Sequence, residues 1–528
     1  MYKTKILLSF FSFILFTGAV AQTQDLIALA KGDFLGMNAL FDEKGNLFGY
    51  ISIYDYGKSG AKTKKFEYVI LDKNLNPFAN KEFEGDITAG NYIGYINFDG
   101  RVLLKPYGLD YSLVEKKDMF TPSAMLINLK DNSISRKVYY DYDHGKFTEI
   151  LQHDTWTENK KEYKAEKKQN GFNYISQVSE IKEGGFLVVE YEDYKSYAKN
   201  NRLMRYDEAK KQLWQYEYNK NGSKTSSEIL NFLDKDEHHY YGLLRTHTKS
   251  SKKDINYSYG MPGDNTTSDT FYLLVIDMNT GKEIQKKQIP DPDDVLSTIM
   301  RFPTISYGML DNDKTFDDKI VIVGRTGSNL YYSGICRLLV DKKTFNTELK
   351  TLSYKDDFKE FIPKIKANGF LENQFELDPR DIFFLKDGSI GILFEKYKVA
   401  TQYTAQKTTD MIYVYTDKNF NIAGSKLFEK EKSRWQNADY LFSQNLNDDN
   451  DLVFFYRDYQ KDTETKDRNW NLFINTYING KFKQEMIPIS SKENFLIIPY
   501  VAKEGYILMQ EFNTKAKYNQ IRLERLNY

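Results

Sequence analysis

Four carboxylates stand at or just beyond the ends of long apolar runs, where they could take part in acid–base chemistry. They are Glu190, Asp193, Glu395 and Glu511. Cleavage of a glycosidic bond needs two such groups facing each other across the bond, one to protonate it and one to attack or to activate water. Nothing in the sequence shows that any two of the four converge. We therefore predict no catalytic residue, and a glycoside hydrolase or lyase is kept as the alternative function.

A second set of side chains, rich in Tyr, Lys and Arg, occupies equivalent places in the chain. It comprises Tyr56, Lys105, Tyr191, Arg245, Arg325, Tyr397 and Arg457. Aromatic rings and guanidinium groups bind sugars by stacking and hydrogen bonding, and they also anchor protein–protein contacts. The set predicts a non-enzymatic binding or scaffolding role toward a glycan or protein partner. Because the chain contains 41 Tyr, packing is the competing interpretation for each tyrosine.

Other chemistry-bearing motifs are missing from the sequence. It has no G-x-S-x-G elbow of a serine hydrolase, and GKSGAKT from Gly57 lacks the spacing of a phosphate-binding loop. The five histidines form no paired metal motif, and the acidic clusters at Asp291, Asp311 and Asn447 do not match a calcium-binding loop. We therefore expect neither a metal nor a cofactor.

The elements that position these residues are repeated hairpins. YVYTDKNFNIAGSKLF, from Tyr413, closely repeats YVILDKNLNPFANKEF, from Tyr68, and both are typical of strand, turn and strand. Five further copies begin at Ser123, Asn201, Phe271, Ile335 and Asn471. Another hairpin of two apolar runs precedes each copy, so a unit of four strands, a to d, recurs every 60 to 80 residues or so.

Tandem four-stranded units predict an all-β fold, a β-propeller of eight four-stranded blades, or seven if one hairpin is misread. The last unit provides only strands a, b and c, so Asp25–Ala30 is expected to supply the fourth strand and to close the ring. An outer-membrane barrel is the rival fold. Continuous apolar b runs such as GFLVVEY disfavour it, because strands of a membrane barrel alternate apolar and polar residues. Charged d strands such as GSKLFEKEK also disfavour it, because the strands of such a barrel face lipid.

With these hairpins, the chain resembles the β-propeller superfamily over essentially all of its length after the first 21 residues. It lacks the Trp-Asp, Kelch and sialidase signatures, and its D-K-N-x-N corners are similar to those of uncharacterised exported bacterial propellers. The resemblance implies a site at the mouth of the central channel. Long b-to-c and d-to-a loops, such as those after Tyr54, Tyr191, Arg245 and Glu395, mark the face on which we expect it.

The composition and the N-terminal segment indicate the compartment. Residues 1–21 have two lysines, an apolar run and an A-V-A end, which predicts a signal peptide followed by one propeller domain, 22–528. The sole cysteine, Cys336, is not placed for lipid attachment, so we expect a periplasmic or extracellular monomer without a membrane span or lipid anchor. The 74 basic and 74 acidic residues give no charge excess for nucleic acid binding.

One segment departs from the strand pattern. DDFKEFIPKIKANGF, from Asp356, places Phe358, Phe361, Ile362 and Ile365 at helical spacing. We predict a short helix that covers a blade edge.

Overall fold

The computed structural model describes most of the chain. The residues described are 22–42, 46–98, 100–107, 125–135, 139–141, 146–148, 174–181, 185–191, 201–207, 211–220, 226–249, 267–291, 295–296, 313–315, 318–328, 331–400, 405–433, 439–461, 464–465, 467–489, 495–513 and 515–528. No helix within these ranges is long and apolar enough to cross a membrane.

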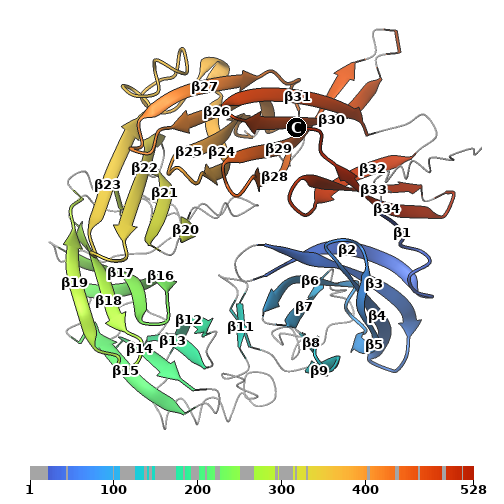
Figure 1. Ribbon diagram of the computed structural model, residues 1–528, viewed down its shortest axis with the longest axis horizontal. Coiled ribbons are helices and arrows are strands. Elements are labelled where there is room, and N and C mark those ends of the chain that lie inside the picture. The colour runs from blue at the N-terminus through green and yellow to red at the C-terminus, as the bar shows by residue number, and fades with distance from the viewer. Residues whose placement is uncertain are drawn as a thin grey trace, which may run out of the picture.

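The strands form eight four-stranded antiparallel blades arranged in a ring, with strand a nearest the centre and strand d at the rim (Figure 1). Blades 1 to 4 consist of β2 (Asp33–Asp42), β3 (Leu47–Lys58), β4 (Thr63–Asp72) and β5 (Pro77–Asp86); β6 (Asn91–Phe98), β7 (Arg101–Tyr107), β8 (Met125–Asn128) and β9 (Ser133–Ser135); β12 (Tyr174–Glu180), β13 (Phe186–Tyr191), β14 (Asn201–Tyr206) and β15 (Gln212–Tyr218); and β16 (Ser226–Lys235), β17 (His239–Lys249), β18 (Thr267–Asp277) and β19 (Glu283–Ile289).

Blades 5 to 8 complete the ring, and the predicted β-propeller with eight blades is confirmed. They consist of β20 (Asp313–Thr315), β21 (Lys319–Ser328), β22 (Tyr331–Asp341) and β23 (Thr347–Ser353); β24 (Glu376–Phe384), β25 (Ile390–Lys398), β26 (Lys407–Thr416) and β27 (Ile422–Phe428); β28 (Tyr440–Leu446), β29 (Asp451–Lys461), β30 (Arg468–Ile478) and β31 (Lys481–Pro488); and β32 (Leu496–Val501), β33 (Tyr506–Asn513), β34 (Tyr518–Arg525) and β1 (Thr23–Asp25). Outside the blades are a hairpin of β10 (Tyr139–Asp141) and β11 (Lys146–Thr148) and the 3-10 turn η1 (Glu372–Gln374).

The N-terminal strand closes the ring, as the sequence predicts. β1 pairs antiparallel with β34, with Gln24 opposite Ile521, and so becomes strand d of blade 8. The observed strand starts two residues before the predicted segment. Immediately after it, the backbone N–H of Leu26 donates to the carbonyl of Asn519 at 2.9 Å, and the Leu26 side chain is fully buried in a cluster shared by blades 1 and 8.

This closure should carry a measurable part of the stability. In a chain beginning at Gln22, we expect Leu26→Ala to lower the free energy of unfolding by about 3 kcal/mol, because it leaves a cavity between the first and last blades. The neighbouring Ile27 is 43% exposed, and Ile27→Ala should change stability by less than about 0.5 kcal/mol. Urea unfolding followed by tryptophan fluorescence measures both, and equal effects of the two changes would contradict the closure.

The repeated D-K-N-x-N corner is one hydrogen-bonded turn between strands c and d. The backbone N–H of Asn76 donates to Oδ1 of Asp72 at 2.9 Å, and its side-chain amide donates to Oδ2 at 3.0 Å. Asn421 repeats both bonds to Asp417, at 2.8 and 3.0 Å. Hydrogen bonds from the backbone and side chain of Asn421 lower the pKa of Asp417. Both copies therefore stabilise the charged carboxylate in the same way.

The apolar residue of this corner packs on the preceding blade. Leu75 and Phe420 both adopt left-handed backbone conformations, with φ of 65° and 59°, and both are fully buried. Leu75 joins the cluster shared with blade 8, and Phe420 joins the cluster between blades 5 and 6, where the Arg337 guanidinium lies 5.3 Å from its ring centroid. Phe345, in the related corner of blade 5, has φ of 55° and contacts the ring of His239 in blade 4. The repeated motif is thus an interblade contact as well as a turn.

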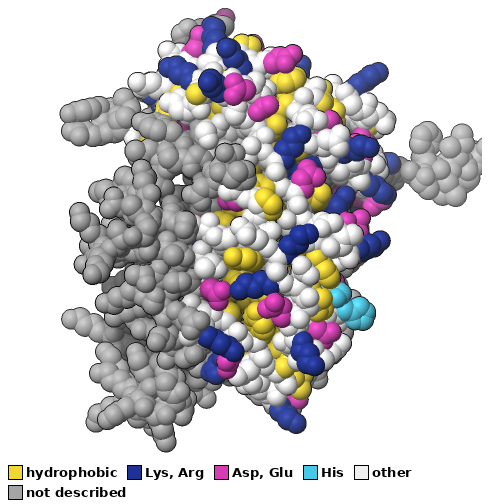
Figure 2. Space-filling view, turned by 90° about the vertical axis from the view of Figure 1, so that its left-hand side faces the viewer, with side chains coloured by type: hydrophobic (Ala, Val, Ile, Leu, Met, Phe, Trp, Pro, Cys, Tyr) yellow, Lys and Arg dark blue, Asp and Glu magenta, His cyan; other side chains and the backbone are white. Residues whose placement is uncertain are grey.

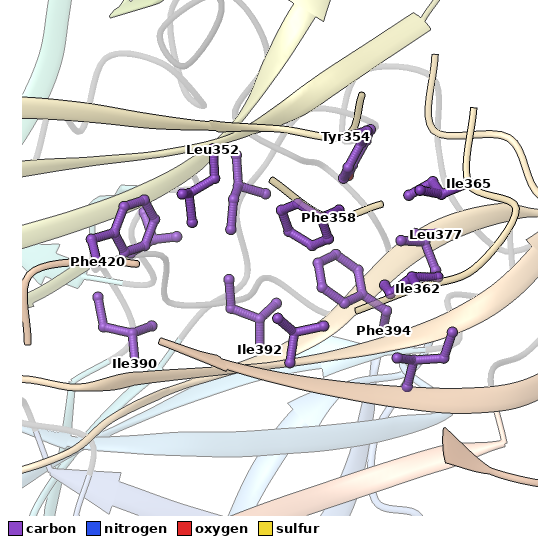
Figure 3. Packing of buried hydrophobic residues seen from close by; sticks show 14 of the residues in the cluster. Leu352, Tyr354, Phe358, Ile362, Ile365, Leu377, Ile390, Ile392, Phe394 and Phe420 are labelled. Atoms are coloured by element: carbon purple, nitrogen blue, oxygen red, sulfur yellow. The ribbon is translucent and has the colours of Figure 1, made fainter. Parts of the chain in front are cut away.

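The segment after β23 is buried, but it does not form the predicted helix. Its residues form successive turns, and the N–H of Ile362 donates to the carbonyl of Phe358 at 2.8 Å. Pro363 lacks an N–H and clashes with the preceding turn, which explains why no helix continues. Phe358 packs edge-to-face on Phe394, so the segment fills the space between blades 5 and 6 (Figure 3).

The outer strands are mostly exposed, as expected for the rim of a propeller. Acidic and basic side chains alternate with small apolar areas over the rim on the side of the blades shown in Figure 2. Mixed charge of this kind prevents strand d from pairing with another chain.

Candidate functional site

All seven predicted binding residues lie on strand b of seven different blades, toward the end at which strand b leads to strand c. They are Tyr56 on β3, Lys105 on β7, Tyr191 on β13, Arg245 on β17, Arg325 on β21, Tyr397 on β25 and Arg457 on β29. The side chains of Lys105 and Tyr191 lie outside the described residues. We call this side of the ring the b–c face; the d-to-a connections lie on it as well.

The long loops predicted for this face are only partly described. The loop after Tyr54 is mainly an extension of the hairpin, in which Lys58 pairs with Lys64. The loops after Tyr191, Arg245 and Glu395 fall largely on residues 192–200, 250–266 and 401–404, which lie outside the described residues.

An ionic chain extends over blades 5 to 7 and connects two of the seven residues, Arg325 and Arg457. Its first part starts on blade 5, where Arg325 forms an ion pair with Asp378 of β24. Asp378 also pairs with Arg380 at 2.9 Å, and Nε of Arg380 lies 2.8 Å from Oε2 of Glu395 at the end of β25. The charges alternate in sign from residue to residue across the junction of the two blades.

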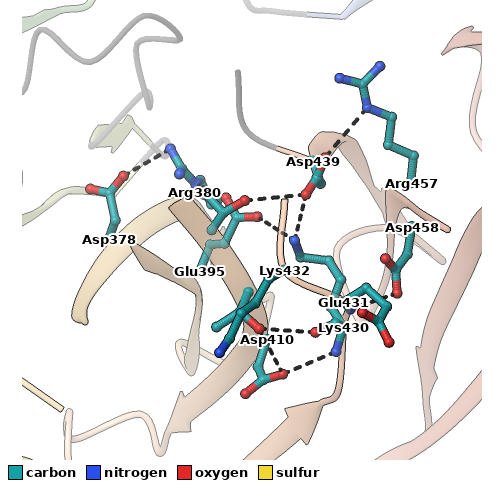
Figure 4. A network of polar contacts seen from close by, with 12 residues as sticks. Asp378, Arg380, Glu395, Asp410, Lys430, Glu431, Lys432, Asp439, Arg457 and Asp458 are labelled. Carbon is teal, nitrogen blue, oxygen red and sulfur yellow. Dashed lines mark hydrogen bonds and ion pairs between the residues drawn. The ribbon is translucent and has the colours of Figure 1, made fainter. Parts of the chain in front are cut away.

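The second part of the ionic chain runs through the connection between blades 6 and 7 (Figure 4). Nζ of Lys430, just after β27, lies 3.3 Å from Oε1 of Glu395 and 2.6 Å from Oδ2 of Asp439. Asp439, just before β28, also lies 3.7 Å from Nε of Arg457 on β29. The lysine is therefore shared by two carboxylates that come from different blades.

The centre of the ionic chain is removed from solvent. The side chains of Glu395 and Lys430 are fully buried, and that of Asp439 is almost so. Burial raises the pKa of Glu395, although the charges of Arg380 and Lys430 act to lower it. A carboxylate in this environment holds neighbouring strands together and is not accessible to a substrate.

Two more carboxylates hold the backbone of the same connection. Asp410, which pairs with Lys396 at 2.8 Å, accepts a hydrogen bond from the N–H of Lys430 at 3.1 Å. Asp458 accepts one from the N–H of Glu431 at 3.1 Å. The connection is thus fastened to strands c of blade 6 and b of blade 7.

Arg457 also belongs to a second group of side chains, the basic–aromatic patch, on β29 and β30. The patch consists of Arg457, Tyr459, Lys461, Arg468 and Trp470. Tyr459 and Trp470 are opposite each other in the sheet, with ring centroids 5.2 Å apart. The guanidinium of Arg457 lies 5.6 Å from the Trp470 centroid, and that of Arg468 lies 4.7 Å from the Tyr459 centroid. Lys461 lies 5.9 Å from the same tyrosine ring.

Sequence reasoning found only Arg457 of this patch. The available signal was alternation, since positions 457, 459 and 461 point to one face of β29 and positions 468 and 470 to the same face of β30. What the sequence did not supply was the register that places the two strands opposite each other.

The remaining predicted residues are held within or beside their own blades. The hydroxyl of Tyr56 donates to Glu67 of the neighbouring strand at 2.5 Å, and the N–H of Lys31 donates to that hydroxyl at 3.3 Å. Arg245 pairs with Asp269 of β18 at 2.8 Å. Burial raises the pKa of Tyr397, and the carboxylates of blade 6 near it act in the same direction. These residues do not join the basic–aromatic patch.

The four candidate carboxylates are not brought together as a described pair. Glu395 is buried in blade 6, whereas Glu511 is in blade 8 and pairs with Arg522 at 3.0 Å. Glu190 is on β13, but its side chain and the whole of Asp193 lie outside the described residues. Among the residues that are described, no group of three or more His, Cys, Asp or Glu could hold a metal ion.

Comparison with known proteins finds one partial family match and several remote structural likenesses. A model described as "Family of unknown function (DUF6770)" matches residues 434–527, which span blades 7 and 8, and no curated protein matches. One similar structure is the β-propeller domain of the Trilobed protease from Pyrococcus furiosus, with 10% identity, a TM-score of 0.27 and coverage of 86% of this chain and 97% of that one.

Two further structures are similar at the same level. One is an ulvan lyase of polysaccharide lyase family PL25, with 10% identity, a TM-score of 0.27 and coverage of 94% of each chain. The other is the WD40 domain of SCAP from fission yeast, with 10% identity, a TM-score of 0.22 and coverage of 96% of this chain and 94% of that one. At these TM-scores the likeness carries no argument.

Proposed function

We propose that this chain is an exported binding protein that recognises a glycan on the b–c face of its ring, without catalysis. The observation that carries the proposal is the basic–aromatic patch on blade 7, which combines exposed cations with a partly exposed indole. Aromatic faces and guanidinium groups supply the stacking and hydrogen bonding through which proteins hold sugars.

The state of the nearby carboxylates supports binding over hydrolysis. Glycosidases keep one carboxyl group as an acid and a second as a base or nucleophile, both in contact with the substrate. Glu395 instead contacts Arg380 and Lys430 in the protein interior, and Glu511 is neutralised by Arg522. Under this proposal, both carboxylates therefore have a structural role in the ring.

Export is part of the proposal and rests on the sequence of residues 1–21. A charged start, an apolar run and small residues before Gln22 are the features that a secretory signal requires. When the full-length chain is produced in a bacterial host, we expect it outside the cytoplasm with Gln22 as its first residue, as mass spectrometry of the N-terminal peptide of the fractionated protein would establish.

The binding function is tested with the purified chain and a panel of soluble neutral and acidic polysaccharides. In native affinity electrophoresis, we expect at least one polysaccharide to retard the protein, with no release of reducing ends over time. Retardation by none of them would contradict glycan binding. Steady release of reducing ends that is abolished by Glu190→Gln, Asp193→Asn, Glu395→Gln or Glu511→Gln would establish the enzymatic alternative.

A further inference from the structure

We propose that the basic–aromatic patch selects an anionic glycan, one whose sugar rings carry carboxylate groups. This inference rests on the proposed function and specifies the ligand class for the same face. It depends on how the cations are held, how far they are neutralised, and how the aromatic rings lie between them.

The cations of the patch are positioned by aromatic rings. Arg457 lies over Trp470 and Arg468 over Tyr459, and a guanidinium that stacks on a ring loses less freedom when it binds an anion. Tyr459 is itself fixed, because its hydroxyl donates to the carbonyl of Lys432 at 2.9 Å. The two arginines are therefore oriented before a ligand arrives.

The patch retains positive charge beyond what its described acidic partners neutralise. Arg468 is exposed and forms no ion pair within the part of the chain that the structure describes. Lys461 is 56% exposed and lies 3.6 Å from Glu431, a loose and solvent-screened pair. Arg457 faces Asp439 only through Nε, at 3.7 Å. The terminal nitrogens of both arginines can therefore form a two-point contact with a carboxylate.

The arrangement of rings and charges favours a sugar acid over an acidic peptide. In a uronic acid, the carboxylate is attached directly to a ring whose C–H face can pack on an aromatic side chain, so that one residue uses a cation and a ring together. A glutamate or aspartate carboxylate is on a flexible chain and would leave the indole of Trp470 unused, which is the partly exposed ring of the patch, since Tyr459 is buried. Arg457 and Lys461 are four residues apart on one strand, about 13 Å, which is long enough for more than one sugar unit.

Three soluble polymers distinguish the ligand classes, and biolayer interferometry with the immobilised chain measures their affinities. Polygalacturonate carries a carboxylate on each sugar, dextran carries none, and poly-glutamate carries carboxylates without sugar rings. We expect polygalacturonate to bind, more weakly at higher salt, and to bind better than the other two. Arg468→Gln should lower its affinity about tenfold to a hundredfold, since it removes a charged hydrogen-bonding group.

A matched control distinguishes the effect of losing one positive charge from the effect of losing the basic–aromatic patch. Arg525 is also exposed and has no described acidic partner, but it lies at the opposite end of strand c in blade 8, so Arg525→Gln should leave polygalacturonate binding unchanged. Because Arg468 is exposed and its contact with the Tyr459 ring is at the surface, Arg468→Gln should fold normally, and its thermal midpoint checks this.

The possible results separate this inference from the proposed function. Binding of dextran without binding of polygalacturonate would overturn the anionic specificity and leave glycan binding intact. Poly-glutamate binding as tight as that of polygalacturonate would overturn the sugar-acid assignment in favour of an acidic peptide. Polygalacturonate binding that Arg468→Gln does not weaken would overturn the assignment to this patch.

Discussion

Replacement of Lys430 by Met is expected to lower the free energy of unfolding by about 3–5 kcal/mol at pH 7, because it leaves buried carboxylates without their shared cation. Nζ of Lys430 contacts both Glu395 and Asp439, and neither carboxylate can turn toward water, since their side chains are buried. Met has a similar length and apolar character, so the effect measures the lost charge and not a cavity. Chemical unfolding of the variant and the parent chain gives the difference.

The pH dependence of this loss has a definite sign. Burial already raises the pKa of Glu395, and removal of Lys430 takes away one of the charges that lower it. A folded-state pKa above the unfolded value means that the folded state takes up protons more readily, so stability is gained as the pH falls toward that pKa. The loss of stability caused by Lys430→Met should therefore become smaller as the pH is lowered from 7 toward the raised pKa of Glu395. Turn carboxylates such as Asp417, whose pKa is lowered from 3.8, lose their contribution only at still lower pH.

Two further variants test whether the uncompensated buried charges cause the loss of stability in Lys430→Met. Lys432 is two residues away and exposed, and Lys432→Met should change stability by less than about 0.5 kcal/mol. Adding Glu395→Gln to Lys430→Met removes one of the uncompensated charges, so the double variant should be more stable than Lys430→Met alone. A double variant that shows the simple sum of two losses would contradict the coupling.

The architecture could be predicted because its information is local and repeated. Each hairpin is specified by apolar runs and by a turn whose Asp and Asn residues bond to each other, as Asp72 and Asn76 do. The closing strand was predicted by counting, because the last unit lacked its fourth strand. The helix expected from Asp356 failed because its periodicity was read without the interruption at Pro363.

The candidate site was harder to predict because it depends on which strand ends meet. The ends of the b strands could be located from the repeats, and Arg325, Tyr397 and Arg457 were found in this way. The ion-pair partners of these residues could not be predicted, because Asp378 is on strand a and Lys430 is in a connection between blades. Such partners follow from the stacking of blades, and a single repeat contains no information about it.

Phe420→Ala is expected to destabilise the ring by about 3–5 kcal/mol, although the residue lies in a turn that sequence alone would treat as replaceable. The ring of Phe420 is fully buried between blades 5 and 6, and it carries the stacked guanidinium of Arg337. Loss of the Phe420 ring leaves a cavity in the packing between the two blades. Leu427→Ala, on the outer strand of the same blade, is the matched control, because Leu427 is 46% exposed and should contribute less than about 0.5 kcal/mol.

The backbone at this position makes a second comparison possible. Phe420 has φ of 59°, which is unfavourable for any residue with a Cβ atom and unstrained for glycine. Phe420→Gly loses the same ring as Phe420→Ala but relieves the backbone, so it should be more stable than Phe420→Ala by about 1 kcal/mol, the reverse of the usual order. Thermal and urea unfolding of the two variants measure the difference. If Ala were as stable as Phe, the repeated corner would act only as a turn and not as the contact that holds one blade to the next. If Ala were more stable than Gly, the backbone at position 420 would not be strained.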